Sequence, residues 1–405
     1  MLDATLITLV PIAALVRLIL SRHHSLYFYL IGLVYVYAVA PYILYLSENP
    51  FYLRFCQTSC LFDLNDLRFG LVMIILMLFP LIIIEFLICR KPACTKKVIT
   101  KINKLYFGQN LYYFYYFFYF LNIVGIFFYG ISDFFSSYTN AESNKIGSLS
   151  WSIMTNSFFL LAVLYGIIGT KSKIINYSFL FLLCFYLIGG ARLVPVMSLL
   201  YLFALWYGPT FKMTSKLLLT LILFCLTFVL LGVFRSSSND LLILANGYLE
   251  FGFVTTGYYN AIAEVDLQQL NLFEFFNNTF RFLPFFPFNE VEDTRLIKDL
   301  FGSEKLFSPV GGSYVISSLF IYFGFFAYVI FLVLVVLLML FDWNSGIKFL
   351  ENPTIKNQIV RSFFVFLTVF ALINLIRNNY YSFVSISAKS IVIHLFLLIN
   401  CKRIK

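Results

Sequence analysis

The sequence predicts an all-α protein that crosses a membrane many times. Of its 405 residues, 61% are hydrophobic and 12% are charged, whereas soluble domains are typically about 25% charged. Apolar runs recur near the ~20-residue length that spans a bilayer as a helix. The first run, at 2–20, lacks a basic start and a small-residue cleavage site, so we expect a span and not a removed signal.

We expect about eleven transmembrane helices, within a range of ten to twelve. They divide the chain into 1–234 with eight helices, a long loop at 235–312, and 313–405 with three helices. The expected spans are 2–20, 26–46, 69–89, 111–131, 151–170, 174–190, 193–208, 217–234, 314–340, 362–376 and 383–400.

Basic residues set the predicted orientation. The connection at 90–104 carries five lysines, one arginine and no acid, so it is expected in the cytoplasm. Alternation then places 171–173, 209–216, 341–361 and the C-terminal CKRIK on the same side, and each is basic. This pattern explains the net charge of +10 without a nucleic-acid partner. The long loop and the N-terminus lie outside.

The long loop is the predicted working part. It holds ten of the 19 acidic residues, and long connections that are not low-complexity usually carry function. Two stretches in it should be short interfacial segments. The mostly apolar 241–263 carries Asn246, Glu250 and Asn260, which make a full span costly, and 280–290 (FRFLPFFPFNE) is aromatic and interrupted by prolines.

Three arginines stand at the predicted outer ends of spans: Arg192 in GGARLVP, Arg235 in FRSSSND and Arg377 in LIRNNYY. A planar guanidinium grips a phosphate with two hydrogen bonds, so this set suits the pyrophosphate of a lipid-linked substrate. Arg281 and Arg295 of the loop are further candidates. The alternative interpretation is that each arginine contacts ordinary lipid phosphates.

A reaction that removes a proton from a hydroxyl needs a base. No histidine lies on the predicted outer side, and His394, deep in the last span, is expected to be a hydrogen-bonded packing residue. The base should then be an acid of the loop. Glu250 ranks first because its apolar surroundings would raise its pKa, and Asp240 ranks second.

Metal and cofactor chemistry have no sequence signature here. No HExxH, DxD-like pair or Gly-rich phosphate loop appears, so we expect no cofactor, no required metal and no nucleotide-sugar donor. Of seven cysteines, Cys56 and Cys60 share one predicted external loop and could pair. The others show no metal or redox spacing.

The segment GGSYVISSLFIYFGFF, at 311–326, resembles the O-antigen polymerase (Wzy) family in its G-S pair, Gly312 and Ser313, and its F-G pair, Phe323 and Gly324. The resemblance implies a GT-C-like arrangement in the bacterial inner membrane, with the active site facing the periplasm. It further implies transfer of a growing glycan from undecaprenyl pyrophosphate onto a new lipid-linked repeat unit. A chain-length regulator would be the protein partner.

Two other functions remain open from the sequence. An O-antigen ligase would use the same donor, although the external histidine usual among ligases has no counterpart here. A lipid-linked oligosaccharide flippase or transporter should place its polar groups near the bilayer midplane. Charges expected inside the membrane are few (Arg17, Glu85 and Lys389), which favours chemistry at the outer surface.

Overall fold

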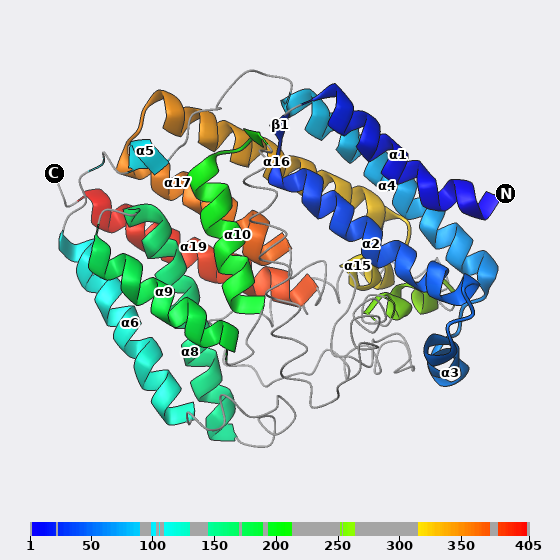
Figure 1. Ribbon diagram of the computed structural model, residues 1–405, viewed down its shortest axis with the longest axis horizontal. Helices are drawn as coiled ribbons and strands as arrows, with labels where there is room; N and C mark the ends of the chain where they lie inside the picture. The colour runs from blue at the N-terminus through cyan, green and yellow to red at the C-terminus, as the bar shows by residue number, and fades with distance from the viewer. Residues whose placement is uncertain are drawn as a thin grey trace. The chain divides into compact units, whose positions relative to one another are not determined.

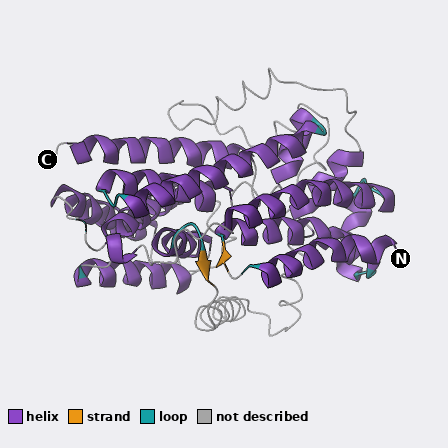
Figure 2. Cartoon of the chain, turned by 90° about the horizontal axis from the view of Figure 1, so that it is seen from above, coloured by secondary structure: helices purple, strands orange, loops and turns teal. Residues whose placement is uncertain are grey.

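The computed structural model describes residues 2–21, 23–89, 99–102, 105, 109–129, 145–169, 172–188, 193–212, 252, 254–263, 315–372 and 380–402. Nearly all of these residues are helical (Figure 2). In this part of the chain, four helices are long and apolar enough to cross a membrane. They are α2 (Leu26–Leu46), α4 (Leu64–Cys89), α6 (Gln109–Tyr129) and α16 (Phe326–Glu351). The protein is therefore a helical membrane protein, and the total of eleven spans stays a prediction.

The chain forms two compact units that interleave along the sequence. Unit 1 comprises Met1–Pro92, Leu241–Phe341 and Phe370–Ser390, and unit 2 comprises Ala93–Asp240, Asp342–Val369 and Ile391–Lys405. Both α16 and α19 (Tyr380–Lys402) contribute to the two units. The sequence division at 234 and 312 follows predicted membrane topology instead, and it stays a prediction.

Unit 1 is built around α4, which packs against both α1 and α2 (Figure 1). The buried α4 residues Leu67, Leu71, Ile74 and Leu78 recur every three or four positions, so they line one face of the helix. The other described elements of unit 1 are α1 (Leu2–Leu20), β1 (His23–His24), α3 (Pro50–Ser59), a helix at 254–263 and α15 (Val315–Phe323).

A reciprocal cap starts α4. The Asp63 Oδ1 atom accepts from the backbone N–H groups of Asn65 at 2.7 Å and Asp66 at 2.9 Å. In return, the Asp63 N–H donates to Asp66 Oδ2 at 2.9 Å. These bonds satisfy donors that a helix start leaves unpaired. The hydrogen bond from the Asp66 backbone is the main reason why the pKa of Asp63 is lowered.

Unit 2 is a bundle in which α8 packs on α6 and α10, and α17 packs on α8 and α10. Gly125 of α6 permits a close approach to α8, because a Cβ there would lie 2.6 Å from Met154 Cγ of α8. The described elements of this unit include α5 (Ile99–Ile102), α8 (Lys145–Ile168), α9 (Lys173–Ile188), α10 (Leu193–Tyr207), β2 (Phe211–Lys212) and α17 (Ile355–Phe366). A π-helical turn, η3 (Leu367–Leu372), follows α17.

Two expected spans differ from the observed helices. The span expected at 314–340 is two helices, α15 and α16, and α16 continues to Glu351 through residues expected to be a cytoplasmic connection. Burial of Trp343 and Phe349 explains the continuation, because it supplies a packed face beyond the apolar run. The span expected at 362–376 begins earlier, as α17, because the Thr354 hydroxyl caps the Asn357 N–H at 3.2 Å. The span expected at 217–234 lies outside the described residues.

Candidate functional site

Most of the predicted site lies outside the described residues. This applies to the five arginines, both candidate bases and the G-S pair, namely Arg192, Arg235, Arg281, Arg295, Arg377, Glu250, Asp240, Gly312 and Ser313. Their roles stay predictions. The structure does describe the F-G pair, and it describes the two helices that border residues 264–314, namely the helix at 254–263 and α15.

Phe323 and Gly324 form the break between α15 and α16. Phe323 is the buried last residue of α15, and Gly324 has a positive φ of 53°, which glycine adopts without steric cost. The Gly324 N–H donates to the Phe320 carbonyl at 2.8 Å, and the Gly324 carbonyl accepts from the Ala327 N–H at 3.0 Å. The F-G pair therefore ends one helix and starts the next.

Tyr258 brings together the residues on either side of 264–314. Its hydroxyl donates to the Gly70 carbonyl of α4 at 2.9 Å and lies 2.7 Å from the Tyr328 hydroxyl of α16. Its ring meets Phe320 of α15 edge-on, with the centroids 6.4 Å apart. Tyr258 thus joins the 254–263 helix to α15, the two described helices that border 264–314 in the sequence.

The 254–263 helix is also bonded to α2. The Thr255 hydroxyl donates to the Tyr37 carbonyl at 2.9 Å, and the Tyr259 hydroxyl donates to the Ala38 carbonyl at 2.6 Å. On the α4 side, a Cβ at Gly70 would lie 2.7 Å from the Tyr259 ring, so only glycine permits this approach without a shift. The helix is therefore held on two sides by protein.

This burial qualifies the expectation for 241–263, a helix lying in the membrane interface: the described residues 254–263 are covered by protein, and the interfacial location stays a prediction. In the described part, Val254, Tyr258 and Ala261 are buried by protein. The signal that could have shown this is the run TTGYYN at 255–260, because its hydrogen-bonding side chains would find no partners in lipid. Residues 280–290 lie outside the described residues.

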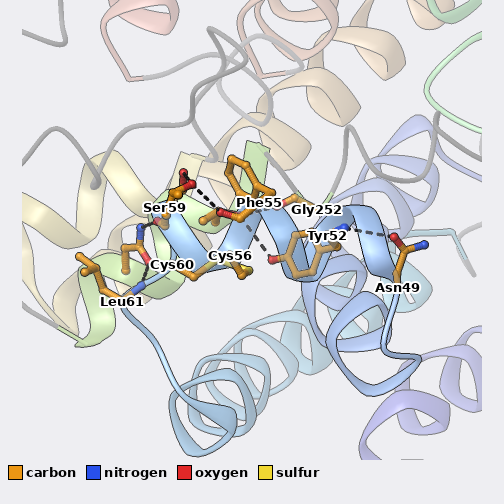
Figure 3. Close-up of a disulfide and its surroundings, with 11 residues drawn as sticks. Asn49, Tyr52, Phe55, Cys56, Ser59, Cys60, Leu61 and Gly252 are labelled. Carbon is orange, nitrogen blue, oxygen red and sulfur yellow. Dashed lines mark hydrogen bonds between the residues drawn. A yellow bond between two sulfur atoms is a disulfide. The ribbon is translucent and has the colours of Figure 1, made fainter.

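A disulfide joins Cys56 and Cys60 at the end of α3, a pairing that the sequence left open (Figure 3). The helix starts at a side-chain cap, since Asn49 Oδ1 accepts from the N–H groups of Phe51 and Tyr52, each at 3.1 Å. The cap and the disulfide both stabilise α3, which forms one edge of unit 1.

The 254–263 helix docks on this edge. Asn260 accepts from the Leu61 N–H and donates to the Ser59 carbonyl, both at 2.8 Å. The Tyr52 hydroxyl lies 3.3 Å from the Thr256 hydroxyl, and its ring lies beside Gly252 (Figure 3). Burial raises the pKa of Tyr52. Together these contacts fix the start of the described loop residues.

A second polar feature of unit 1 is a buried ion pair, here termed the Arg17–Glu85 cluster. Arg17 Nε and Nη2 donate to the two Glu85 oxygens at 2.7 and 2.9 Å, and the side chains are 2% and 0% exposed. Glu85 Oε1 also accepts from the N–H and hydroxyl of Ser25 and from the Cys89 thiol. The carboxylate therefore links α1, α2 and α4.

His24 completes this cluster. The Arg17 Nη1 group lies 3.4 Å from His24 Nδ1, which must be unprotonated to accept from it, and Nη2 donates to the His23 carbonyl at 2.7 Å. Burial, followed by the Arg17 charge, lowers the pKa of His24. The cluster thus favours a neutral imidazole beside the guanidinium.

In unit 2, a hydrogen-bonded chain joins three helices. The Tyr201 and Ser362 hydroxyls lie 2.6 Å apart, and Ser362 Oγ lies 2.9 Å from His394 Nε2. The imidazole meets the rings of Phe363 and Phe366 edge-on. The interpretation of His394 as a hydrogen-bonded packing residue is confirmed.

The polar cluster of unit 2, defined as Asp342, Gln358 and Arg361, was missed by sequence reasoning. It comes from 341–361, which we treated as a cytoplasmic connection, yet all three residues are buried. Arg361 Nη2 donates to the Ala204 carbonyl of α10 at 2.9 Å, and its charge acts on Asp342. The detectable signal was helical spacing, because Gln358, Arg361 and Val365 share one face of α17.

Two further findings bear on the candidate site: one concerns metal binding and the other the comparison with known proteins. Among the described residues, no group of three or more His, Cys, Asp or Glu side chains could hold a metal ion. No family model, no curated protein and no solved structure matches the chain.

Proposed function

We propose that the chain is an O-antigen or surface-polysaccharide polymerase of the bacterial inner membrane. It would transfer a growing glycan from undecaprenyl pyrophosphate onto a new lipid-linked repeat unit at the periplasmic face, as a metal-independent glycosyltransferase. The observation that carries the proposal is the contact between Tyr258 and Phe320, because it joins the 254–263 helix to α15, the two described helices on either side of 264–314. A long polar segment held at both borders is suited to position two lipid-linked glycans.

The disulfide supports the predicted orientation. Cys56 and Cys60 lie in the connection between α2 and α4, which the topology places outside, and disulfides persist in oxidising compartments such as the periplasm. The 254–263 helix docks directly on the disulfide-bearing edge, through Asn260. The segment that follows it would therefore start on the periplasmic side.

The chemistry assigns separate roles to the arginines and the acids. Arg192, Arg235 and Arg377, with Arg281 and Arg295 from the loop, would hold the pyrophosphate and stabilise the charge that develops as it leaves. Glu250, or Asp240 in its place, would take the proton from the acceptor hydroxyl. The bond from the donor sugar to phosphate breaks, the new glycosidic bond forms, and undecaprenyl pyrophosphate departs.

Analysis of surface polysaccharide in a deletion strain tests the reaction class. Loss of a polymerase leaves lipid A-core that carries a single repeat unit, and a plasmid copy of the gene restores long chains. Bare core would instead indicate the ligase or the flippase. Unchanged long chains would remove the protein from this process.

Substitution of the arginines tests the pyrophosphate role. We expect Arg192→Ala, Arg235→Ala and Arg377→Ala each to abolish long chains at normal protein level, and Arg→Lys to retain little activity, because lysine lacks the planar fork. Arg54→Ala is the matched control, since Arg54 is an exposed arginine of α3 on the same predicted side, and it should keep long chains. Wild-type chain length in all three alanine variants would refute the role.

A further inference from the structure

Gln358 and Asp342, two buried side chains of unit 2, carry polar atoms that find no hydrogen-bond partner among the described residues. Gln358 is 0% exposed, and neither its Oε1 nor its Nε2 finds a hydrogen-bond partner in the described part of the chain. Asp342 is 7% exposed, and its Oδ1 is likewise buried without a donor among the described residues. Such groups are rare in folded proteins, because each forfeits its hydrogen bonds to water.

These two side chains share a neighbour. Gln358 stands three positions before Arg361 on α17, so the two side chains lie on one face of that helix. Asp342 lies within electrostatic range of the same guanidinium. Arg361 is therefore the common neighbour: Gln358 shares its face of α17, and Asp342 lies close enough for the guanidinium charge to act on its carboxyl group.

The chemistry of this group selects its occupant. Asp342 Oδ1 and Gln358 Oε1 need donors, whereas Gln358 Nε2 needs an acceptor, so the occupant must both donate and accept. The Arg361 charge disfavours a metal cation, and the Asp342 carboxyl disfavours an anion. Water meets all the requirements, and buried waters are typically held by two to four polar groups. We propose that unit 2 contains an internal site for ordered water, lined by Asp342, Gln358 and Arg361.

This site is independent of the proposed reaction. It explains how α17 can turn the Gln358 amide toward the interior of unit 2 without a partner among the described residues. The Arg361 charge acts on Tyr201, whose hydroxyl belongs to the chain that continues to Ser362 and His394, so the water would lie beside a polar network that crosses α10, α17 and α19.

X-ray radiolytic footprinting with mass spectrometry tests the site in the full-length protein in nanodiscs. Hydroxyl radicals formed from a bound water oxidise side chains that bulk solvent does not reach. Tyr201, on which the Arg361 charge acts, and Tyr186, which Asn122 bonds elsewhere in the bundle, are both 0% exposed. We expect oxidation of Tyr201 to be at least several-fold faster than that of Tyr186.

Gln358→Met removes the amide at nearly constant length and should lower Tyr201 oxidation toward the Tyr186 rate. If this variant does not fold, Asp342→Leu serves instead, because it removes the other unsatisfied group at similar size, and the same decrease is expected. Oxidation of Tyr201 no faster than that of Tyr186 in the wild-type protein overturns the proposal. A Tyr201 rate that is unchanged in the folded variant also overturns it, since the radicals would then come from another source.

Discussion

Glu85 in unit 1 and Asp342 in unit 2 are both buried acids with an arginine nearby, but their surroundings differ. Glu85 accepts hydrogen bonds from Arg17, Ser25 and Cys89, so its charge is neutralised and its oxygens are satisfied by protein. Asp342 receives the field of Arg361, while its Oδ1 has no donor among the described residues. Protein groups satisfy the Glu85 carboxylate by direct hydrogen bonds. The Asp342 carboxyl group needs a donor other than the described side chains.

The difference shows two ways in which a helical membrane protein can bury charge. Direct pairing ties α1, α2 and α4 together through one carboxylate, which specifies how these helices pack. An incompletely paired cluster fixes the helices less strongly but leaves polar atoms available to water. Removing one partner of the direct pair leaves an uncompensated buried charge, which strongly lowers stability. In the incompletely paired cluster, water can rearrange around the altered side chain, so the loss of stability should be smaller.

The largest change in the free energy of unfolding is expected when the acid of each cluster is replaced by its amide. Glu85→Gln leaves the Arg17 charge without its carboxylate in a buried site, a change that typically costs about 3–5 kcal/mol. Asp342→Asn should cost less than half as much, because Arg361 keeps its bond to the Ala204 carbonyl. Thermal unfolding of both variants in detergent measures the difference, and equal losses would contradict the comparison.

A double substitution serves as the control. Arg17→Met combined with Glu85→Leu removes both charges at similar volume, so it should recover most of the stability lost in Glu85→Gln. Failure of the pair to recover stability would mean that the cluster contributes specific hydrogen bonds beyond charge balance.

An intermediate effect is expected at Tyr258, whose hydroxyl is satisfied directly, as in the Arg17–Glu85 cluster. Tyr258→Phe leaves the Tyr328 hydroxyl without this partner and should cost on the order of 1 kcal/mol. Tyr113→Phe, at an exposed position of α6, should leave the unfolding temperature unchanged. Combining Tyr258→Phe with Tyr328→Phe should cost less than the sum of the single losses, and simple additivity would argue against the bond.

The smallest expected effect is on the pH dependence of the unfolding temperature, through the protonation of His24. Because the folded protein lowers the pKa of His24, the unfolded chain binds more protons as pH falls below the ordinary histidine range. The contribution of neutral His24 is therefore complete above about pH 6.5, the unperturbed value, and is lost as pH falls through the folded pKa. Unfolding temperature should decrease between pH 7.5 and 5.5 in the wild type and decrease less in His24→Gln. Tyr113→Phe, at an exposed position of α6, is the control and should keep the wild-type slope.

Much of the fold was predictable because bilayer thickness fixes helix length. The spans expected at 2–20 and 26–46 coincide with α1 and α2. The break at Gly324 was not predicted, because a single glycine in an apolar run is compatible with a continuous helix, and only its positive φ reveals the turn.

The polar interior was harder to predict than the helices. Arg17 and Glu85 were expected inside the membrane, but their pairing depends on how α1 and α4 meet. Arg361 was counted with the cytoplasmic charges because its segment is polar on average, whereas the face of α17 that carries it is buried. For the predicted arginine site, the sequence supplies residue types and positions along the chain, and their common location stays a prediction.

The most direct measurement is polymerisation by the purified protein in proteoliposomes, supplied with undecaprenyl-pyrophosphate-linked repeat unit and a metal chelator. The account predicts a ladder of lipid-linked glycans that differ by whole repeat units, present in the wild type and Arg54→Ala and absent in Arg192→Ala, Arg235→Ala and Arg377→Ala. Repeat units that remain single with the wild-type protein, or a ladder that persists in all three arginine variants, would contradict it.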